Sequence, residues 1–147
     1  MTDFRQITPE FLASPQITPE DVAEAARLGC TLIVNNRPEG EAQDQPAGSV
    51  IESAAKDAGL SYLAIPITHA GFSEPQVAAL DEALSNASGP VLAYCRSGTR
   101  STLLWALAQA RTGQDPAWIA EHAAAAGYDV APIAPMIDFY AGQARSA

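Results

Sequence analysis

The segment VLAYCRSGTRSTLLWALA, residues 91–108, restricts the fold of this chain more than any other stretch of the sequence. An apolar run leads into Cys95, a short loop containing Gly98 follows, and a second apolar-periodic run begins after Arg100. This pattern predicts a buried strand, a tight loop and a helix. Because a helix N-terminus carries unpaired N–H groups and a partial positive charge, it favours both a bound anion and a thiolate. A cysteine nucleophile in an anion-binding loop makes an enzyme the leading hypothesis.

The chain is strongly acidic, which makes two arginines in one short loop unusual. The 147 residues carry a formal net charge of −9 and only eight Lys or Arg side chains. Arg96 and Arg100 nevertheless fall in one short loop, so we expect them to bind an anion. A chain this acidic is not expected to bind nucleic acid or an acidic membrane surface.

Helix and strand signals alternate along the chain. Helices are expected at 18–28, 49–58, 73–84, 101–112, 115–127 and 135–143, strands at 31–35, 61–67 and 91–94, and an edge strand or hairpin near the start. The alternation predicts a single α/β domain, residues 1–147, in three layers, with a mostly parallel central sheet of about four or five strands and helices on both faces. Ligands of such sheets bind beyond the carboxyl ends of the strands. Cys95, Arg37 and His69 all follow strand ends and are therefore expected at one edge.

The residues between Cys95 and the helix have the chemistry of an anion cradle. Ser97 and Thr99 can form hydrogen bonds within the loop, and Gly98 permits the backbone angles that turn N–H groups inward. Together with the helix dipole and the two guanidinium groups, these N–H groups are expected to favour the thiolate of Cys95. The predicted catalytic residues are Cys95 and Arg100, and the predicted anion-binding residues are Arg96, Ser97, Gly98, Thr99, Ser101 and Arg37.

Two known families share features with these residues. CRSGTRS resembles the active loop of rhodaneses, C-R-x-G-x-R-[ST], in which a cysteine carries sulfane sulfur as a persulfide. The stretches GCTLIVNNRPEGE, GLSYLAIPIT and GPVLAYCRSGTRS resemble the phosphatase-like domain of beta-lactamase-hydrolase-like proteins, roughly over residues 4–112. That resemblance implies the fold of dual-specificity, cysteine-dependent phosphatases. Members of the family are called phosphatases or sulfurtransferases, so the resemblance alone leaves the reaction open.

Two features of the sequence favour sulfur transfer over phosphate hydrolysis. Protein tyrosine and dual-specificity phosphatases use Cys-x5-Arg, whereas Cys95 and Arg100 have the Cys-x4-Arg spacing of rhodaneses. Those phosphatases also protonate the leaving oxygen with an Asp on a neighbouring loop. The loop after the 61–67 strand has no Asp and offers His69 and Glu74 as candidate acids. Transfer of sulfur from thiosulfate needs no acid, because sulfite is already a good leaving group.

The main hypothesis is therefore a cysteine-dependent sulfurtransferase on a phosphatase-like scaffold. The Cys95 thiolate would take sulfur from thiosulfate or a persulfide and pass it to a small thiol acceptor or cyanide. The alternative is a phosphatase that acts on a phosphate ester through a phosphocysteine at Cys95, with Arg100 holding the phosphate and His69 or Glu74 as the acid. A third hypothesis is an inactive anion-binding module.

For several residues outside the loop, the sequence suggests structural roles as well as functional ones. Arg37 and Glu39 either lie beside the substrate or form an ion pair that orders their own loop. Asn35 and Asn36 are expected to form turns. Cys30 is expected to be a small core residue, and a role as a resolving thiol is the less favoured alternative.

No cofactor is expected, because the sequence has neither metal-ligand spacing nor a Gly-rich nucleotide fingerprint. Two cysteines do not make a disulfide framework, and no window is apolar enough to span a membrane. A cytoplasmic location is the resulting expectation.

Overall fold

Residues 2–146, the part of the chain described by the computed structural model, contain a five-stranded sheet with the order β1-β2-β5-β3-β4. The strands are β1 (Arg5–Thr8), β2 (Phe11–Ser14), β3 (Leu32–Asn35), β4 (Ser61–Ala64) and β5 (Val91–Tyr94). The helices are α1 (Pro19–Arg27), α2 (Gly48–Asp57), α3 (Glu74–Asn86), α4 (Thr99–Arg111), α5 (Pro116–Ala125) and α6 (Ala134–Ser146), with a short 3₁₀ turn, η1 (Ala131–Ile133). Only β1 pairs antiparallel, with β2. The predicted α/β class and mostly parallel sheet are confirmed.

The central strand of the sheet is β5, and all four of its residues are buried. It pairs in parallel with β2 on one side and β3 on the other, so that Leu92 lies opposite Leu12 and Ile33. A continuous apolar run is typical of a strand that is buried on both faces. Since Cys95 follows this strand directly, it lies just past the carboxyl end of the middle strand of the sheet.

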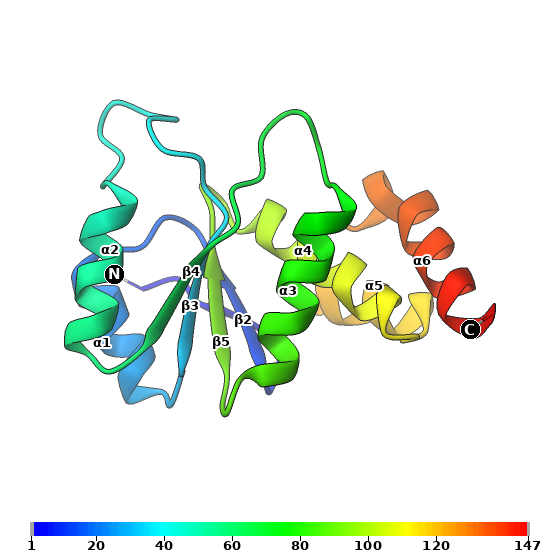
Figure 1. Ribbon diagram of the computed structural model, residues 1–147, viewed down its shortest axis with the longest axis horizontal. Coiled ribbons are helices and arrows are strands. Elements are labelled where there is room, and N and C mark those ends of the chain that lie inside the picture. Colours follow the sequence, from blue (N-terminus) through cyan, green and yellow to red (C-terminus); the bar gives the residue numbers. More distant parts are fainter. Residues whose placement is uncertain (1, 147) are drawn as a thin grey trace. The chain divides into compact units, whose positions relative to one another are not determined.

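The chain divides into two compact units, of which the first contains the sheet and the Cys95 loop. This first unit comprises residues 1–71 and 87–101. Its helices α1 and α2 pack against each other, and α2 also packs against β3 and β4 (Figure 1). Side chains of these helices, of the strands and of the residues that connect them form one apolar core: Leu12, Ile17, Val22, Ala25, Cys30, Ile33, Ile51, Ala55, Leu60, Leu92 and Tyr94.

The first helix begins where the sequence predicts. Thr18 and Asp21 form a reciprocal capping box, in which each side chain accepts a hydrogen bond from the backbone N–H of the other. Pro19 occupies the first turn, where its missing N–H has no consequence. The helix ends before Gly29, whose φ of +91° an L side chain rarely adopts.

The second unit comprises residues 72–86 and 102–147 and is helical. The rings of Trp105 and Trp118 lie 6.1 Å apart between centroids. Arg111 joins α4 to α3 through ion pairs with Glu74 at 3.1 Å and Asp81 at 3.0 Å. Within residues 2–146 we find no helix with the length and apolar character needed to cross a bilayer.

The strand expected at 61–67 is shorter than predicted, because regular pairing of β4 stops at Ala64. Pro66 lacks the N–H that a regular ladder requires. The chain still runs along β3, since Ile65 N donates to Asn35 O at 2.9 Å and Ile67 N to Asn36 O at 3.0 Å. This irregular extension carries the Ile67 carbonyl toward the Cys95 loop.

Candidate active site

Cys95 lies at the carboxyl end of β5 with its side chain fully buried. Its backbone N–H donates to Ser14 O at 3.2 Å, which ties the start of the loop to β2. The backbone N–H of Gly98 donates to Cys95 Sγ at 3.1 Å. Gly98 has a φ of +90°, and this left-handed conformation turns its N–H inward. The loop therefore directs at least one backbone donor to the sulfur.

The rest of the loop is ordered by its own hydroxyl groups. Ser97 Oγ donates to Thr99 Oγ1 at 3.0 Å and accepts from Thr99 N at 3.4 Å, where α4 begins. Ser101, predicted to bind the anion, is buried and donates its hydroxyl to Asn36 Oδ1 at 2.7 Å. Ser101 therefore ties the first turn of α4 to the segment after β3.

Arg100, in the first turn of α4 directly after the Cys95 loop, is held by Glu41. Its Nη1 donates to Glu41 Oε2 and its Nη2 to Glu41 Oε1, both at 2.7 Å, and Nη1 also donates to Ile67 O at 2.9 Å. The hydrogen bonds to Glu41 raise the pKa of Arg100, and the neighbouring Cys95 side chain contributes to the same shift. Arg100 thus combines a bidentate ion pair with proximity to the sulfur.

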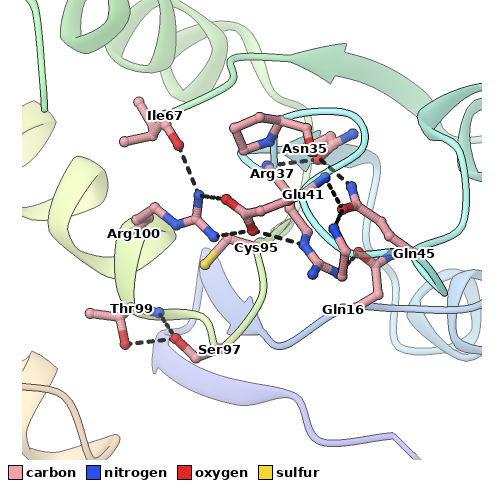
Figure 2. Close-up of polar contacts among 12 residues, drawn as sticks. Gln16, Asn35, Arg37, Glu41, Gln45, Ile67, Cys95, Ser97, Thr99 and Arg100 are labelled. Atoms are coloured by element: carbon pink, nitrogen blue, oxygen red, sulfur yellow. Dashed lines mark hydrogen bonds and ion pairs between the residues drawn. The ribbon is translucent and has the colours of Figure 1, made fainter. Parts of the chain in front are cut away.

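Glu41 stands between two guanidinium groups (Figure 2). Besides the pair with Arg100, Glu41 Oε1 accepts from Arg37 Nε at 3.0 Å. The hydrogen bond from Arg100 is the largest cause that lowers the pKa of Glu41 to about 2, and Arg37 contributes further. The carboxylate therefore stays ionised in the folded protein over the whole physiological range.

The ion pair expected for Arg37 exists, but its partner is Glu41. Arg37 is buried and reaches Glu41 with Nε and Gln16 Oε1 with Nη1, the latter at 2.9 Å. Glu39 instead accepts from the N–H of Gly48 at 2.9 and 3.0 Å, at the start of α2. A Cβ at Gly48 would lie 2.8 Å from Glu39 Oε2, so a larger residue there would have to displace the capping carboxylate. The interpretation that paired Arg37 with Glu39 needs this correction.

The loop that carries Glu41 is closed by Gln45. Its Oε1 accepts from Glu41 N at 3.0 Å and from Ala42 N at 3.2 Å, and its Nε2 donates to Pro38 O at 2.9 Å. The side chain thus spans the loop and replaces regular backbone pairing. Glu41 is consequently presented from an ordered segment.

The prediction that Asn36 forms a turn also needs correction, because its side chain is fully buried and links separate segments. Its Nδ2 donates to Ile65 O at 2.9 Å, its Oδ1 accepts from Ser101 Oγ, and its N–H donates to Tyr94 O at 2.8 Å. One side chain therefore joins the segments that follow β3 and β4 to the first turn of α4. Asn35 does fit a turn, because its Oδ1 accepts from Arg37 N at 2.8 Å.

A hollow of about 320 Å³ lies over Arg100. It is lined by Glu41, Thr68, His69, Arg96 and Arg100. The first unit thus brings His69, Arg96 and Arg100 to one hollow, beside the carboxyl ends of the strands. Glu74, the other candidate acid, belongs to the second unit.

Within that second unit, Glu74 pairs with Arg111 and accepts a hydrogen bond from Tyr140 at 2.7 Å. An ionised carboxylate with these two partners is suited to joining helices. Burial of the Tyr140 ring, and then its hydrogen bond to Glu74, raise the pKa of the phenol to about 12.

Cys30 lies in the apolar core of the first unit, where burial raises the pKa of its thiol. Such a thiol is poorly suited to redox or nucleophilic work. The search for clusters of three or more His, Cys, Asp or Glu side chains able to hold a metal found none among residues 2–146.

With the site described, the comparisons with known proteins decide its family. Residues 3–112 match the family described as "Beta-lactamase hydrolase-like protein, phosphatase-like domain". The chain belongs to this family. A beta-lactamase hydrolase-like protein of Xylella fastidiosa is 33% identical over 108 residues, which cover 74% of this chain. The match covers only 25% of that relative, so the chain spans about a quarter of the curated proteins it resembles.

Solved structures agree with this membership of the phosphatase-like domain family. A candidate phosphatase from Neisseria meningitidis superimposes with a TM-score of 0.81 at 31% identity, covering 92% of this chain and 96% of its own. P. aeruginosa TpbA, a Cys-to-Ser variant in complex with phosphotyrosine, gives a TM-score of 0.67 at 18% identity, covering 98% and 91%. The fold is that of cysteine phosphatases. The predicted sulfurtransferase gains no support from these comparisons, which fit the phosphatase alternative better.

Sequence reasoning missed three residues of this site: Gln16, Asn36 and Glu41. Gln16 follows β2, which the sequence left as an edge strand or hairpin. Placing β2 beside β5 would have put Gln16 at the active edge. The two carboxylates of NRPEGE, Glu39 and Glu41, indicate an ion-pair partner for Arg100. The sequence does not show which of them contacts Arg100.

Proposed function

We propose that the chain hydrolyses phosphate monoesters through a phosphocysteine at Cys95. The observation that carries the proposal is the loop itself, in which the Gly98 N–H points at Cys95 Sγ and Arg100 closes the turn beside it. Membership of the phosphatase-like domain family supports the same reaction. The phosphotyrosine held by TpbA supports a phosphate ester as the substrate class.

In the first step, the Cys95 thiolate attacks the phosphorus atom of the bound ester. A P–S bond forms while the P–O bond to the leaving alcohol breaks. The imidazolium of His69, in the same hollow as Arg100, gives its proton to the departing oxygen. Arg100 and the inward loop N–H groups hold the remaining phosphoryl oxygens as their charge increases.

In the second step, a water molecule attacks the phosphorus of the phosphocysteine. The neutral imidazole of His69 takes a proton from this water, the P–S bond breaks, and inorganic phosphate and the Cys95 thiolate are formed. The thiolate is again stabilised by the Gly98 N–H. His69 thus returns to the imidazolium form, and the cycle consumes one ester and one water.

Glu41 has a defined part in this cycle. Its carboxylate occupies both outer nitrogens of Arg100, the donors that a phosphate needs for bidentate binding. Substrate binding therefore requires Arg100 to exchange one anion for another. Arg37 remains to neutralise Glu41 once Arg100 has turned to the phosphate.

A second candidate, sulfur transfer, is favoured by one observation, the four-residue spacing between Cys95 and Arg100. A shorter loop makes a smaller cradle. In this reaction the thiolate attacks the outer sulfur of thiosulfate, an S–S bond forms on Cys95, and sulfite leaves with the electron pair of the broken bond. The persulfide then gives its outer sulfur to cyanide or a thiol.

One paired assay separates the two reactions. The native chain is incubated either with p-nitrophenyl phosphate or with thiosulfate and cyanide. The reaction is quenched with acid, and the mass of the intact protein is measured by mass spectrometry. We expect ester hydrolysis and a mass gain of one HPO3 group, both lost in Cys95→Ser and both retained in Cys30→Ser. Thiocyanate formation with a gain of one sulfur atom, and no ester hydrolysis, would overturn the proposal in favour of sulfur transfer.

A further inference from the structure

A second hollow, of about 260 Å³, adjoins the Cys95 loop within the same unit. Its polar lining consists of Gln16, Arg37, Asp44, Gln45 and Arg96. Arg96 lines this hollow and also the one that holds His69 and Arg100. A ligand bound at Cys95 that extends past Arg96 would therefore enter the second hollow.

The two arginines of this hollow have unused donors. Arg37 is only 6% exposed, yet its Nη2 has no polar partner among the residues that the structure describes, because Nε binds Glu41 and Nη1 binds Gln16. The exposed Arg96 side chain likewise has no hydrogen bond or ion pair within residues 2–146. A buried guanidinium that lines a hollow and has a free N–H donor can bind an anion there.

The amide side chains beside the arginines order this hollow rather than compete for the ligand. Gln16 accepts from Arg37 and donates to Ile17 O at 3.0 Å. The side-chain amide of Gln45 forms hydrogen bonds with three backbone groups of its own loop. The position of the Arg37 guanidinium is thus fixed before any ligand arrives, which reduces the entropy lost on binding.

We propose that this hollow is a subsite for a second anionic group of the substrate, a phosphate or a carboxylate on the same molecule as the scissile phosphate. The inference rests on the proposed function, which places the first phosphate at Cys95. Arg37 and Arg96 bind the second group, and Asp44 limits its affinity by charge repulsion. The substrate class is therefore a doubly anionic phosphate ester and not a simple aryl phosphate.

The test measures binding without turnover, in the Cys95→Ser chain. The probes are the bisphosphates of propane, butane and hexane diols, the matched diol monophosphates, and chains of the same lengths with one phosphate and one terminal carboxylate. We expect calorimetry to show at least one doubly anionic probe binding about tenfold tighter than its monophosphate, as two charge-assisted hydrogen bonds at a partly exposed site allow. The bisphosphate and phosphocarboxylate arms identify which second anion is preferred. Equal affinity for singly and doubly anionic probes at every length would overturn the proposal.

Variants of the subsite test its residues. Arg96→Gln and Arg37→Gln should each reduce the ratio of the two affinities toward one, whereas Asp44→Asn should increase it. Arg96 is exposed, so its variant remains informative even if Arg37→Gln fails to fold. The matched control is Arg27→Gln, which removes the same charge from α1, where Arg27 pairs with Glu24, and it should leave the ratio unchanged. A ratio that persists in Arg96→Gln, or that falls equally in Arg27→Gln, would contradict the assignment.

This measurement separates failure of the inference from failure of the proposed function. If the native chain hydrolyses no ester while the Cys95→Ser chain still prefers doubly anionic probes, the reaction is wrong and the subsite stands. If hydrolysis proceeds and no length is preferred, the subsite is wrong and the reaction stands.

Discussion

Glu41 binds both terminal nitrogens of Arg100, each at 2.7 Å, and so occupies the arginine that follows the Cys95 loop. A carboxylate and a phosphate present similar pairs of oxygens to a guanidinium. The two anions therefore compete for one fork of donors. The affinity of the site for an oxyanion then depends on Glu41 as well as on the loop.

Replacing Glu41 by Gln tests this competition. In Glu41→Gln, phosphate no longer displaces a charged partner from Arg100, and we expect its binding to tighten by about fivefold, a modest value because the pair is partly exposed. Calorimetric titration with inorganic phosphate measures it. Glu39→Gln is the matched control, since Glu39 caps α2 and does not touch Arg100. Weaker phosphate binding in Glu41→Gln would show that the carboxylate chiefly positions Arg100.

The same carboxylate predicts a pH dependence of stability. Arg100, with Arg37, lowers the pKa of Glu41 from 4.5 to about 2 in the folded chain. A carboxyl with a depressed folded pKa stabilises the fold above its unfolded pKa and loses that contribution as the pH falls. The stability difference between the native chain and Glu41→Gln should therefore be constant near neutrality and shrink as the pH falls from about 4.5 to about 2. Urea denaturation of both proteins across this range checks it, and a difference that does not change with pH would contradict it.

His69 is expected to act as the acid, and its contribution should depend on the leaving group. In His69→Gln, turnover of phenyl phosphate should fall by about 100-fold, because a phenolate needs protonation as it departs. Turnover of p-nitrophenyl phosphate should change much less, since nitrophenolate leaves unassisted. Steady-state kcat values for the two esters give the ratio. The comparison variant is Glu74→Gln, and a changed ratio there instead would transfer the role to Glu74.

Asn36 is expected to stabilise the fold and the loop together. Asn36→Ala leaves the Ser101 hydroxyl and the Ile65 carbonyl without this partner, and we expect a loss of about 2 kcal/mol in the free energy of unfolding. A double-mutant cycle with Ser101→Ala, measured by urea denaturation, should show a coupling of at least about 0.5 kcal/mol. Strictly additive losses would mean that the two side chains act independently.

The Cys95 loop could be predicted because its determinants are contiguous in the sequence. Cys95 follows an apolar strand and Gly98 permits the left-handed turn, whereas the helix starts at Thr99, two residues before the predicted start at 101. The capping box of Thr18 and the glycine stop of α1 are equally local. Each of these signals lies within one turn or one strand, so no knowledge of distant contacts was needed.

The partners of the loop could not be predicted in the same way, because they depend on long-range contacts. Glu41 and Arg100 lie 59 positions apart, and Glu39 is as plausible a partner from the sequence alone. Asn36 reads as a turn residue until Ser101, 65 positions later, is placed against it. The prediction of the reaction has the same limit. The Cys95–Arg100 spacing is a local feature and favours sulfur transfer, whereas the fold as a whole is that of cysteine phosphatases.

The position of β5 also has a consequence for how the protein is made. The strand that delivers Cys95 is the middle strand of the sheet, and it is the last of the five to leave the ribosome. Until Val91–Tyr94 have been synthesised, the hairpin of β1 and β2 and the pair of β3 and β4 have no neighbour to join them. The nascent chain therefore completes its sheet and brings Cys95 into place in the same event, and a chain cut short before this strand would expose unpaired strand edges that invite aggregation.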